Sequence, residues 1–320
     1  MKKSTTIWLI TAVCLILAGC IIFGSVMSVL GWDFKKLSTY KYETNSYEIA
    51  EKYTDIYIKA DTANIIFVPS ESEKTSVVCY EVENMEHKVS VRDNTLFIEA
   101  QDNRSWYEYI GIGFDTTKIT VYLPAGEYGE LTIRASTGKT EIPKDFSFED
   151  ISITKSTGSV SLKASAKDDI KVKTATGNIN VEGVSAESLT LSVSTGRITA
   201  SGVKCSDDVE IEVSTGKTSL RDIECENLAS NGSTGNIELI SVVAKEKISI
   251  ETSTGNISFE SSDAAEVFVR TSTGNVSGTL LNEKVFIVST DTGKVDVPKT
   301  AGGGICEITT DTGNIELRIK

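Results

Sequence analysis

The sequence predicts an all-β fold: a parallel β-solenoid of about ten regular coils of 19–20 residues, with irregular N-terminal coils and one preceding transmembrane helix. Three observations favour it. A Thr-Gly pair recurs ten times between Gly138 and Gly313, at steps of 19 or 20 residues, and a fixed period is typical of stacked repeats. Apolar and polar residues alternate on both sides of each pair, as in half-buried strands. An uncharged segment, residues 4–32, precedes the repeats.

The uncharged segment predicts a membrane anchor. Residues 7–30 are nearly all apolar. A helix of this length would span ~36 Å, which exceeds the ~30 Å hydrocarbon core of a bilayer. We therefore expect residues 1–6 to be a short cytoplasmic N-terminus and residues 7–30 to be a signal anchor that contacts the membrane. We favour an extracellular solenoid at the cell membrane, although the lysines that flank the segment differ little in number.

Two other interpretations of the anchor remain. The segment Leu17-Ala18-Gly19-Cys20 resembles a lipobox, in which Cys20 would carry a lipid, but apolar residues continue directly beyond it. A cleaved signal peptide would have an apolar region of about 7–15 residues, and this one is longer.

An irregular region follows the anchor. We expect a linker at residues 31–54 and irregular β coils that cap the rod at residues 55–130. Ala60-Asp61-Thr62-Ala63-Asn64 resembles a degenerate repeat turn. The aromatic residues of loop 104–114 suggest a contact surface, since Trp and Tyr favour interfaces, although we favour a loop folded over the end of the core. These residues are Trp106, Tyr107, Tyr109 and Phe114.

Residues 131–320 form the regular solenoid in this prediction. Four positions of each repeat are mostly apolar: those seven and five residues before the glycine, and those two and four residues after it. Over the ten repeats, 36 of these 40 positions are apolar, with Cys306 and Ala200 counted. Each repeat is therefore strand, turn, strand and return segment, and glycine suits the turn because it accepts positive φ. We interpret the Thr-Gly pairs as a structural turn ladder. They are Thr137-Gly138, Thr157-Gly158, Thr176-Gly177, Thr195-Gly196, Thr215-Gly216, Thr234-Gly235, Thr254-Gly255, Thr273-Gly274, Thr292-Gly293 and Thr312-Gly313.

The cysteines give one candidate cross-link. Cys205 and Cys225 hold the same position in consecutive repeats, nine residues after the glycine. Adjacent coils would place their Cα atoms about 5 Å apart, within the range of a disulfide. We favour two small buried residues in a column of Ala and Cys, with the disulfide as the alternative.

Composition excludes several kinds of function. The net charge of −13 and the lack of a basic patch argue against nucleic acid as a partner. His87 is the only histidine, which removes most acid–base and triad schemes that use histidine. No cysteine or histidine spacing is typical of a metal site. We expect no enzyme activity, no catalytic residues, no bound metal and no cofactor.

The order of segments resembles a known bacterial family. An apolar anchor leads into Trp32-Asp33-Phe34 and Tyr42-Glu43-Thr44, and Ser-Thr-Gly-Asn repeats follow Leu123-Pro124. This order is similar to the β-strand-repeat family known as "putative adhesin", whose function is unknown, over residues 33–320. The resemblance implies a membrane-tethered solenoid and carries no catalytic residues to this chain.

Three functional hypotheses follow. The first is a non-enzymatic surface protein that presents the solenoid for adhesion or envelope scaffolding to an unidentified protein or glycan. The second is a cytoplasm-facing, membrane-tethered scaffold or sensor partner, self-associating through the C-terminal coil, which would be uncapped at Lys320. The third and most remote is a carbohydrate-active β-helix enzyme.

Overall fold

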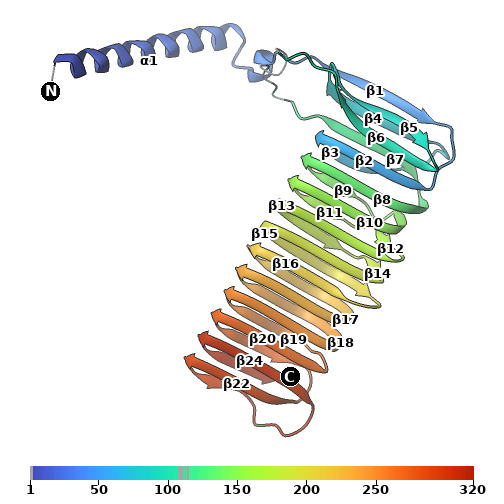
Figure 1. Cartoon of the computed structure of the whole chain (residues 1–320), viewed down its shortest axis with the longest axis vertical. Helices are drawn as coiled ribbons and strands as arrows, with labels where there is room; N and C mark the ends of the chain where they lie inside the picture. The colour runs from blue at the N-terminus through green and yellow to red at the C-terminus, as the bar shows by residue number, and fades with distance from the viewer. Residues whose placement is uncertain (1–2, 107–110, 112, 114) are drawn as a thin grey trace.

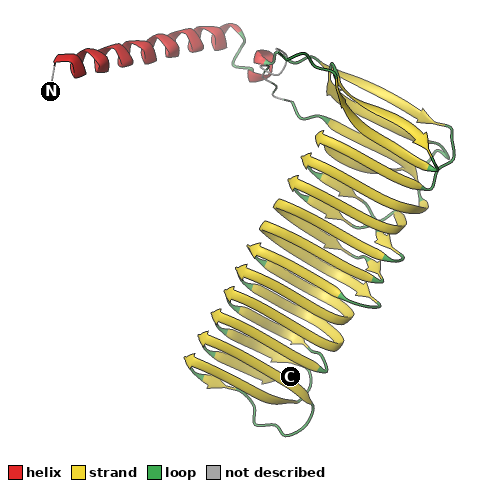
Figure 2. Cartoon of the chain, viewed as in Figure 1, coloured by secondary structure: helices red, strands yellow, loops and turns green. Residues whose placement is uncertain are grey.

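The computed structural model describes residues 3–106, 111, 113 and 115–320. It shows a β-solenoid rod with a cap of antiparallel strands at its N-terminal end, from which helix α1 extends (Figure 1). Strands make up nearly the whole rod, and short loops join them at the corners (Figure 2). The predicted fold class is confirmed, with the two topological differences described below.

Helix α1 spans Lys3–Val29, so it begins earlier than the predicted 7–30 and ends one residue sooner. Its end is a Schellman motif, in which a residue with positive φ closes the last turn. Gly31 has φ +67°, its N–H donates to the carbonyl of Ser28, and the N–H of Trp32 donates to the carbonyl of Met27. A short 3-10 helix, η1 (Phe34–Leu37), follows.

The N-terminal region, predicted as irregular coils that cap the rod, contains one solenoid coil and a cap of antiparallel strands. β2 (Asp55–Thr62) and β3 (Asn64–Ser70) form a first coil, in which Thr62 pairs with Thr137. The cap is formed by β1 and by β4 to β7, and in it β1 pairs with β4, β4 with β7 and β5 with β6, all antiparallel. The cap consists of β1 (Tyr42–Ile49), β4 (Thr75–Val82), β5 (Met85–Arg92), β6 (Thr95–Asp102) and β7 (Lys118–Pro124).

A tight hairpin explains the antiparallel cap. Asp93 and Asn94 both have positive φ between β5 and β6, which is the geometry of a type I′ turn. β6 then lies parallel on β2, β7 lies parallel on β3, and β4 meets β5 at Val82 and Met85. The cap therefore joins the two faces of the solenoid and closes its N-terminal end.

The regular coils stack in parallel and in register, so equivalent residues form columns. Ile133, Ile153, Val172, Leu191 and Ile211 form one such column, and all are fully buried. Apolar columns like this one make a continuous core. The strands up to β18 are β8 (Gly126–Thr137), β9 (Thr140–Ile142), β10 (Phe146–Thr157), β11 (Val160–Leu162), β12 (Ser165–Ala166), β13 (Asp169–Glu182), β14 (Ser185–Ala186), β15 (Ser188–Cys205), β16 (Val209–Thr215), β17 (Thr218–Thr234) and β18 (Ile237–Thr254).

The last strands do not stack in chain order. They are β19 (Ile257–Ser262), β20 (Glu266–Thr273), β21 (Val276–Leu280), β22 (Lys284–Thr292), β23 (Val295–Asp296), β24 (Gly304–Thr312) and β25 (Ile315–Ile319). β24 lies between β20 and β22, and β25 lies between β21 and β23. The coil of β22 and β23 is therefore the distal edge. The expectation that the C-terminal coil is the open edge is wrong.

Two glycines allow the C-terminal coil to enter between its neighbours. A Cβ on Gly303 would collide with the carbonyl oxygen of Glu283, and one on Gly304 would collide with that of Ala265. Gly303 also has φ +85°, which side-chain-bearing residues rarely adopt. The backbone thus passes closely between two coils at the start of β24.

The glycine corner sets the stacking distance. A Cβ on Gly216 would collide with the carbonyl oxygen of Gly196 in the preceding coil, and φ at Gly216 is +144°. The N–H of Gly216 donates to the carbonyl of Thr234 at 2.8 Å. Side-chain amides add a second ladder, since Asn275 accepts from the N–H of Asn314 at 2.8 Å.

Lys155 lies in the interior of the rod. Lys155 occupies an inward column between Ala135 and Thr174, and only 3% of its surface is exposed. Its Nζ donates to Thr140 Oγ1 at 3.0 Å. Burial disfavours the charged form and lowers the pKa of Lys155 to about 8.

The glycine corner predicts the effect of one methyl group. Gly216→Ala should lower the free energy of unfolding by more than about 2 kcal/mol, because the added Cβ meets backbone and φ is unfavourable. Gly126→Ala is the matched control, since nothing lies within 4 Å of a Cβ there, and should change stability by less than about 0.5 kcal/mol. Denaturant midpoints followed by circular dichroism measure both. Equal midpoints for the two variants would contradict the close approach.

Lys155→Met should stabilise the protein. The pKa of Lys155 is about 8 when folded, against 10.5 for the free side chain. Between these values the unfolded state binds more protons, so wild-type stability rises with pH. The variant should gain about 2–3 kcal/mol at pH 7, at 1.36 kcal/mol per pKa unit, and lose that advantage above pH 10.5. Denaturation across this pH range is the measurement, and a variant less stable at every pH would contradict it.

Candidate functional site

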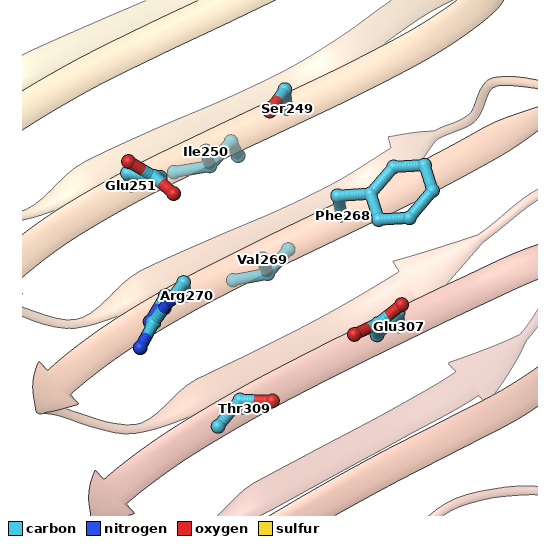
Figure 3. A pocket seen from close by; sticks show the side chains of 8 residues that line it. All are labelled: Ser249, Ile250, Glu251, Phe268, Val269, Arg270, Glu307 and Thr309. Atoms are coloured by element: carbon cyan, nitrogen blue, oxygen red, sulfur yellow. The ribbon is translucent and has the colours of Figure 1, made fainter.

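A groove on the outer face near the distal end is the main candidate site. It has a volume of about 350 Å³ and crosses β18, β20 and β24. Its lining residues are Ser249, Ile250, Glu251, Phe268, Val269, Arg270, Glu307 and Thr309 (Figure 3).

Register places these side chains in two outward rows. Ser249, Phe268 and Glu307 are opposite one another on adjacent strands. Glu251, Arg270 and Thr309 form the second row. The strands alternate, so the intervening Ile250 and Val269 point into the core (Figure 3).

The groove combines an aromatic surface with charged groups. Phe268 is half-buried, and Lys247 Nζ lies 4.3 Å from the centre of its ring. Glu251, Arg270 and Glu307 are exposed around it. Such a surface can stack against a flat ligand and bind its polar groups. Its lining holds no nucleophile with a neighbouring histidine base, because the only histidine, His87, lies in the cap.

The outward rows continue to the distal edge with apolar side chains. Ile287 on β22 is opposite Glu307, and Val285 is opposite Ile305. Ile287 is 54% exposed and Val285 is 37% exposed. The groove is therefore continuous with an exposed apolar edge.

A second cluster lies inside the cap. Cys79, Glu81 and His87 each offer a ligand atom, all within 4.8 Å of one another, and these residues could hold a metal ion. Alternation along β4 puts Cys79 and Glu81 on one face, a signal that the sequence analysis did not use. Glu81 Oε2 is 2.6 Å from His87 Nδ1 and accepts from the His87 N–H, and Glu81 Oε1 accepts from Asn45 Nδ2.

The electrostatics of this cluster favour a packed polar pair. Burial opposes ionisation of Glu81, but the hydrogen bonds from His87 and Asn45 outweigh it and lower the pKa of that carboxyl. Burial raises the pKa of the Cys79 thiol to about 12. Thiolate is the form that binds metal, and both Glu81 oxygens already accept hydrogen bonds. The donor set therefore fits a metal poorly.

The Thr-Gly pairs lie at one corner of the rod, as stacked turns. Thr176 pairs with Thr195 and Gly177 with Gly196, and the threonine column runs on to Thr312 and Thr292 at the distal end. Their place in the fold is a backbone corner, three residues along each strand from the groove row of Glu251, Arg270 and Thr309.

Cys205 and Cys225 lie in consecutive coils at the predicted position, but both are free buried thiols. The disulfide between them stays an alternative. Burial raises the pKa of Cys205 to about 11 and that of Cys225 to about 12. So little thiolate forms that these cysteines should be unreactive.

The predicted contact loop is described only in part. Trp106 is 78% exposed. Tyr107, Tyr109 and Phe114 lie outside the described residues, so the proposed contact surface there stays a prediction.

Comparison with solved structures finds one chain with the same fold and others that are less similar. A "putative adhesin" from Parabacteroides merdae is 14% identical, with 75% of this chain and 97% of that chain covered, at a TM-score of 0.50. A "putative adhesin" from Parabacteroides distasonis is 12% identical, with 87% and 98% covered, at 0.46. A "putative lipid binding protein" from the same species is 18% identical, with 74% and 94% covered, at 0.44. Identities this low indicate fold alone.

Family comparison is more decisive than these pairwise similarities. No curated protein sequence matches this chain. The family model described as Toastrack DUF4097 matches residues 53–207 and 202–320, which is most of the chain. The chain therefore belongs to the Toastrack DUF4097 family.

Proposed function

We propose that this chain is a non-enzymatic, membrane-tethered protein that presents its solenoid outside the cell for adhesion or envelope scaffolding. One observation carries the proposal: the apolar helix and the groove lie at opposite ends of a stacked rod (Figure 1). Coils spaced by about 4.8 Å place the distal surface on the order of 50 Å from the cap.

The helix supports the tether. Ser4–Val29 is long and apolar enough to cross a membrane, with a mean hydropathy of 2.6 over its 18-residue window, and that window is not buried against the rest of the chain. A signal sequence meets the same criteria. Continuation of α1 from Cys20 to Val29 supports an anchor over lipidation at Cys20, since a lipid-modified cysteine is normally followed by a polar tether.

The distal face supports recognition. Phe268 and Arg270 are side chains of the kinds enriched at interfaces, and the apolar Ile287 continues their surface to the edge. The word adhesin in the names of the structural relatives agrees with such a role. The ligand would be a protein or a glycan with a flat apolar surface and polar groups.

The lone histidine supports a binding role over catalysis. His87 is buried inside the cap, and the groove side chains are an aromatic ring, carboxylates, a guanidinium and hydroxyls. A cytoplasm-facing scaffold is the second candidate. The open strand edge of β22 supplies a surface for the self-assembly that such a scaffold needs.

Cysteine labelling on intact cells tests the orientation. Ser272→Cys places a thiol at an exposed position of the rod, and Ser4→Cys places one at the exposed start of α1. A membrane-impermeant maleimide should label Ser272→Cys on intact cells and Ser4→Cys only after permeabilisation. The wild-type chain measures background labelling, which should be low. Burial raises the pKa of Cys79, Cys225 and Cys306 to about 12, and Cys14 and Cys20 lie in α1, which would be inside the membrane.

The reversed labelling pattern would contradict the outward solenoid and favour the cytoplasmic scaffold. Labelling of Ser272→Cys on intact cells, with Ser4→Cys and the wild-type chain unlabelled, would establish the outward orientation directly.

A further inference from the structure

The rod has one closed end and one open end. The cap joins both faces at the N-terminal end. At the other end, β22 pairs with β24 on one side, and no strand in the described part of the chain pairs with its other side. The backbone groups on that side form a template for a further strand.

The middle of this strand lacks the devices that usually prevent pairing, although Thr300 Oγ1 donates to the carbonyl of Lys284 at its start. Residues 285–290 read Val-Phe-Ile-Val-Ser-Thr, with no charge, proline or glycine. Val285 and Ile287 are exposed on the outer face, and Phe286 and Val288 are only half-buried on the inner face. Short segments with high β-propensity and no charge pair readily with other strands.

The edge is held in place by buried and bridging contacts. Lys284 Nζ lies 2.7 Å from Asp263 Oδ1, and each side chain is only 4% exposed. Thr290 Oγ1 donates to the carbonyl of Gly313 at 2.9 Å. On the other face, Arg318 Nη2 lies 2.6 Å from Asp296 Oδ2. Both strands of the distal coil are therefore fixed on the rod.

Charge distinguishes the tip from the rest of the rod. The whole chain carries a net charge of −13. Residues 281–303 hold three acidic and three basic side chains, which sum to zero. The acidic ones are Glu283, Asp291 and Asp296, and the basic ones are Lys284, Lys294 and Lys299. Rods side by side would repel each other, whereas two tips would not.

We propose that a second copy of this chain occupies the edge, with two solenoids paired tip to tip through antiparallel β22 strands. Head-to-tail stacking would need the free side of the first coil, where β6 and β7 of the cap already pair with β2 and β3. A tip-to-tip contact is isologous and forms a closed dimer. Opposite residues in an antiparallel pair share a face. A two-fold axis at Ile287 therefore sets Phe286 of each copy opposite Val288 of the other.

In the tip-to-tip dimer, the positions of the two membrane anchors indicate a bridging role. Helix α1 leaves the rod at the end away from β22 (Figure 1), so a tip-to-tip dimer would hold its two anchors at its outer ends. The inference rests on the proposed outward solenoid, and it names the partner as the same protein on an opposing membrane. One tip is a small contact, so many parallel contacts would supply the strength.

Cysteine cross-linking of the full chain in detergent tests the pairing. Ile287→Cys should give a disulfide-linked dimer on oxidation, because residue 287 would face itself across the two-fold axis. Val285→Cys is the matched control: it is exposed on the same strand but would lie opposite Ser289, on the order of 14 Å from its own copy. Wild type measures background from Cys14 and Cys20, which are exposed. Equal dimer yields from the two variants, or none above background, would overturn the proposal.

Vesicle clustering tests the bridging geometry. Phosphatidylcholine vesicles carrying the full chain should cluster in light scattering, and Ile287→Lys should abolish the clustering by charging the edge. Val243→Lys is the control, at an exposed valine in the middle of the rod. Clustering by Ile287→Lys as strong as wild type would overturn it. So would vesicles that carry the Ser272→Cys chain and stay dispersed although its solenoid is labelled from outside. The cell-surface labelling experiment reports the orientation alone, so a failure of the proposed orientation is distinguishable from a failure of tip-to-tip pairing.

Discussion

The close backbone approach at the glycine corner is the constraint on which the rest of the structure depends. Each corner glycine in the rod lies where a Cβ would collide with a carbonyl of the neighbouring coil, as Gly216 does with Gly196. That contact keeps the coils in register. Register in turn builds the apolar columns of the core, the outward rows of the groove and the polar ladder of asparagines. A rod of this kind separates its two ends, and the proposed function depends on that separation.

Periodicity predicted the solenoid because each coil repeats the same inward positions. It could not predict the order of the last coils, since β22 and β24 carry equivalent Thr-Gly corners and would stack equally well by pattern. The distinguishing signal lies between them, in Gly303 and Gly304, whose close approaches to Glu283 and Ala265 become clear only in three dimensions. An antiparallel hairpin in the cap could have been predicted from the sequence, because Asp93 and Asn94 are residue types that tolerate the positive φ of a hairpin turn.

The groove was beyond the reach of sequence patterns for a different reason. Phe268, Glu307 and Ile287 share a row only because β24 lies between β20 and β22. Outward positions are free to vary, so no spacing marks them. The only histidine, His87, lies outside the Thr-Gly repeats in the sequence, but its pairing with Glu81 becomes apparent only in the folded cap. Cys205 and Cys225 are buried on adjacent coils, as the repeat pattern predicted, and the disulfide between them stays an alternative.

Hydrogen–deuterium exchange on the full Ile287→Lys chain, whose distal edge stays unpaired, tests the account most directly, because it reports which coil is the edge. Because β24 pairs with β20 on one side and with β22 on the other, the amides of Gly304–Thr312 should exchange more slowly than those of Lys284–Thr292 on β22, which pairs on one side only. If the coils stacked in chain order, β24 would be the edge. Rapid exchange throughout β24 together with full protection of β22 would then contradict the exchanged coils and the distal surface built on them.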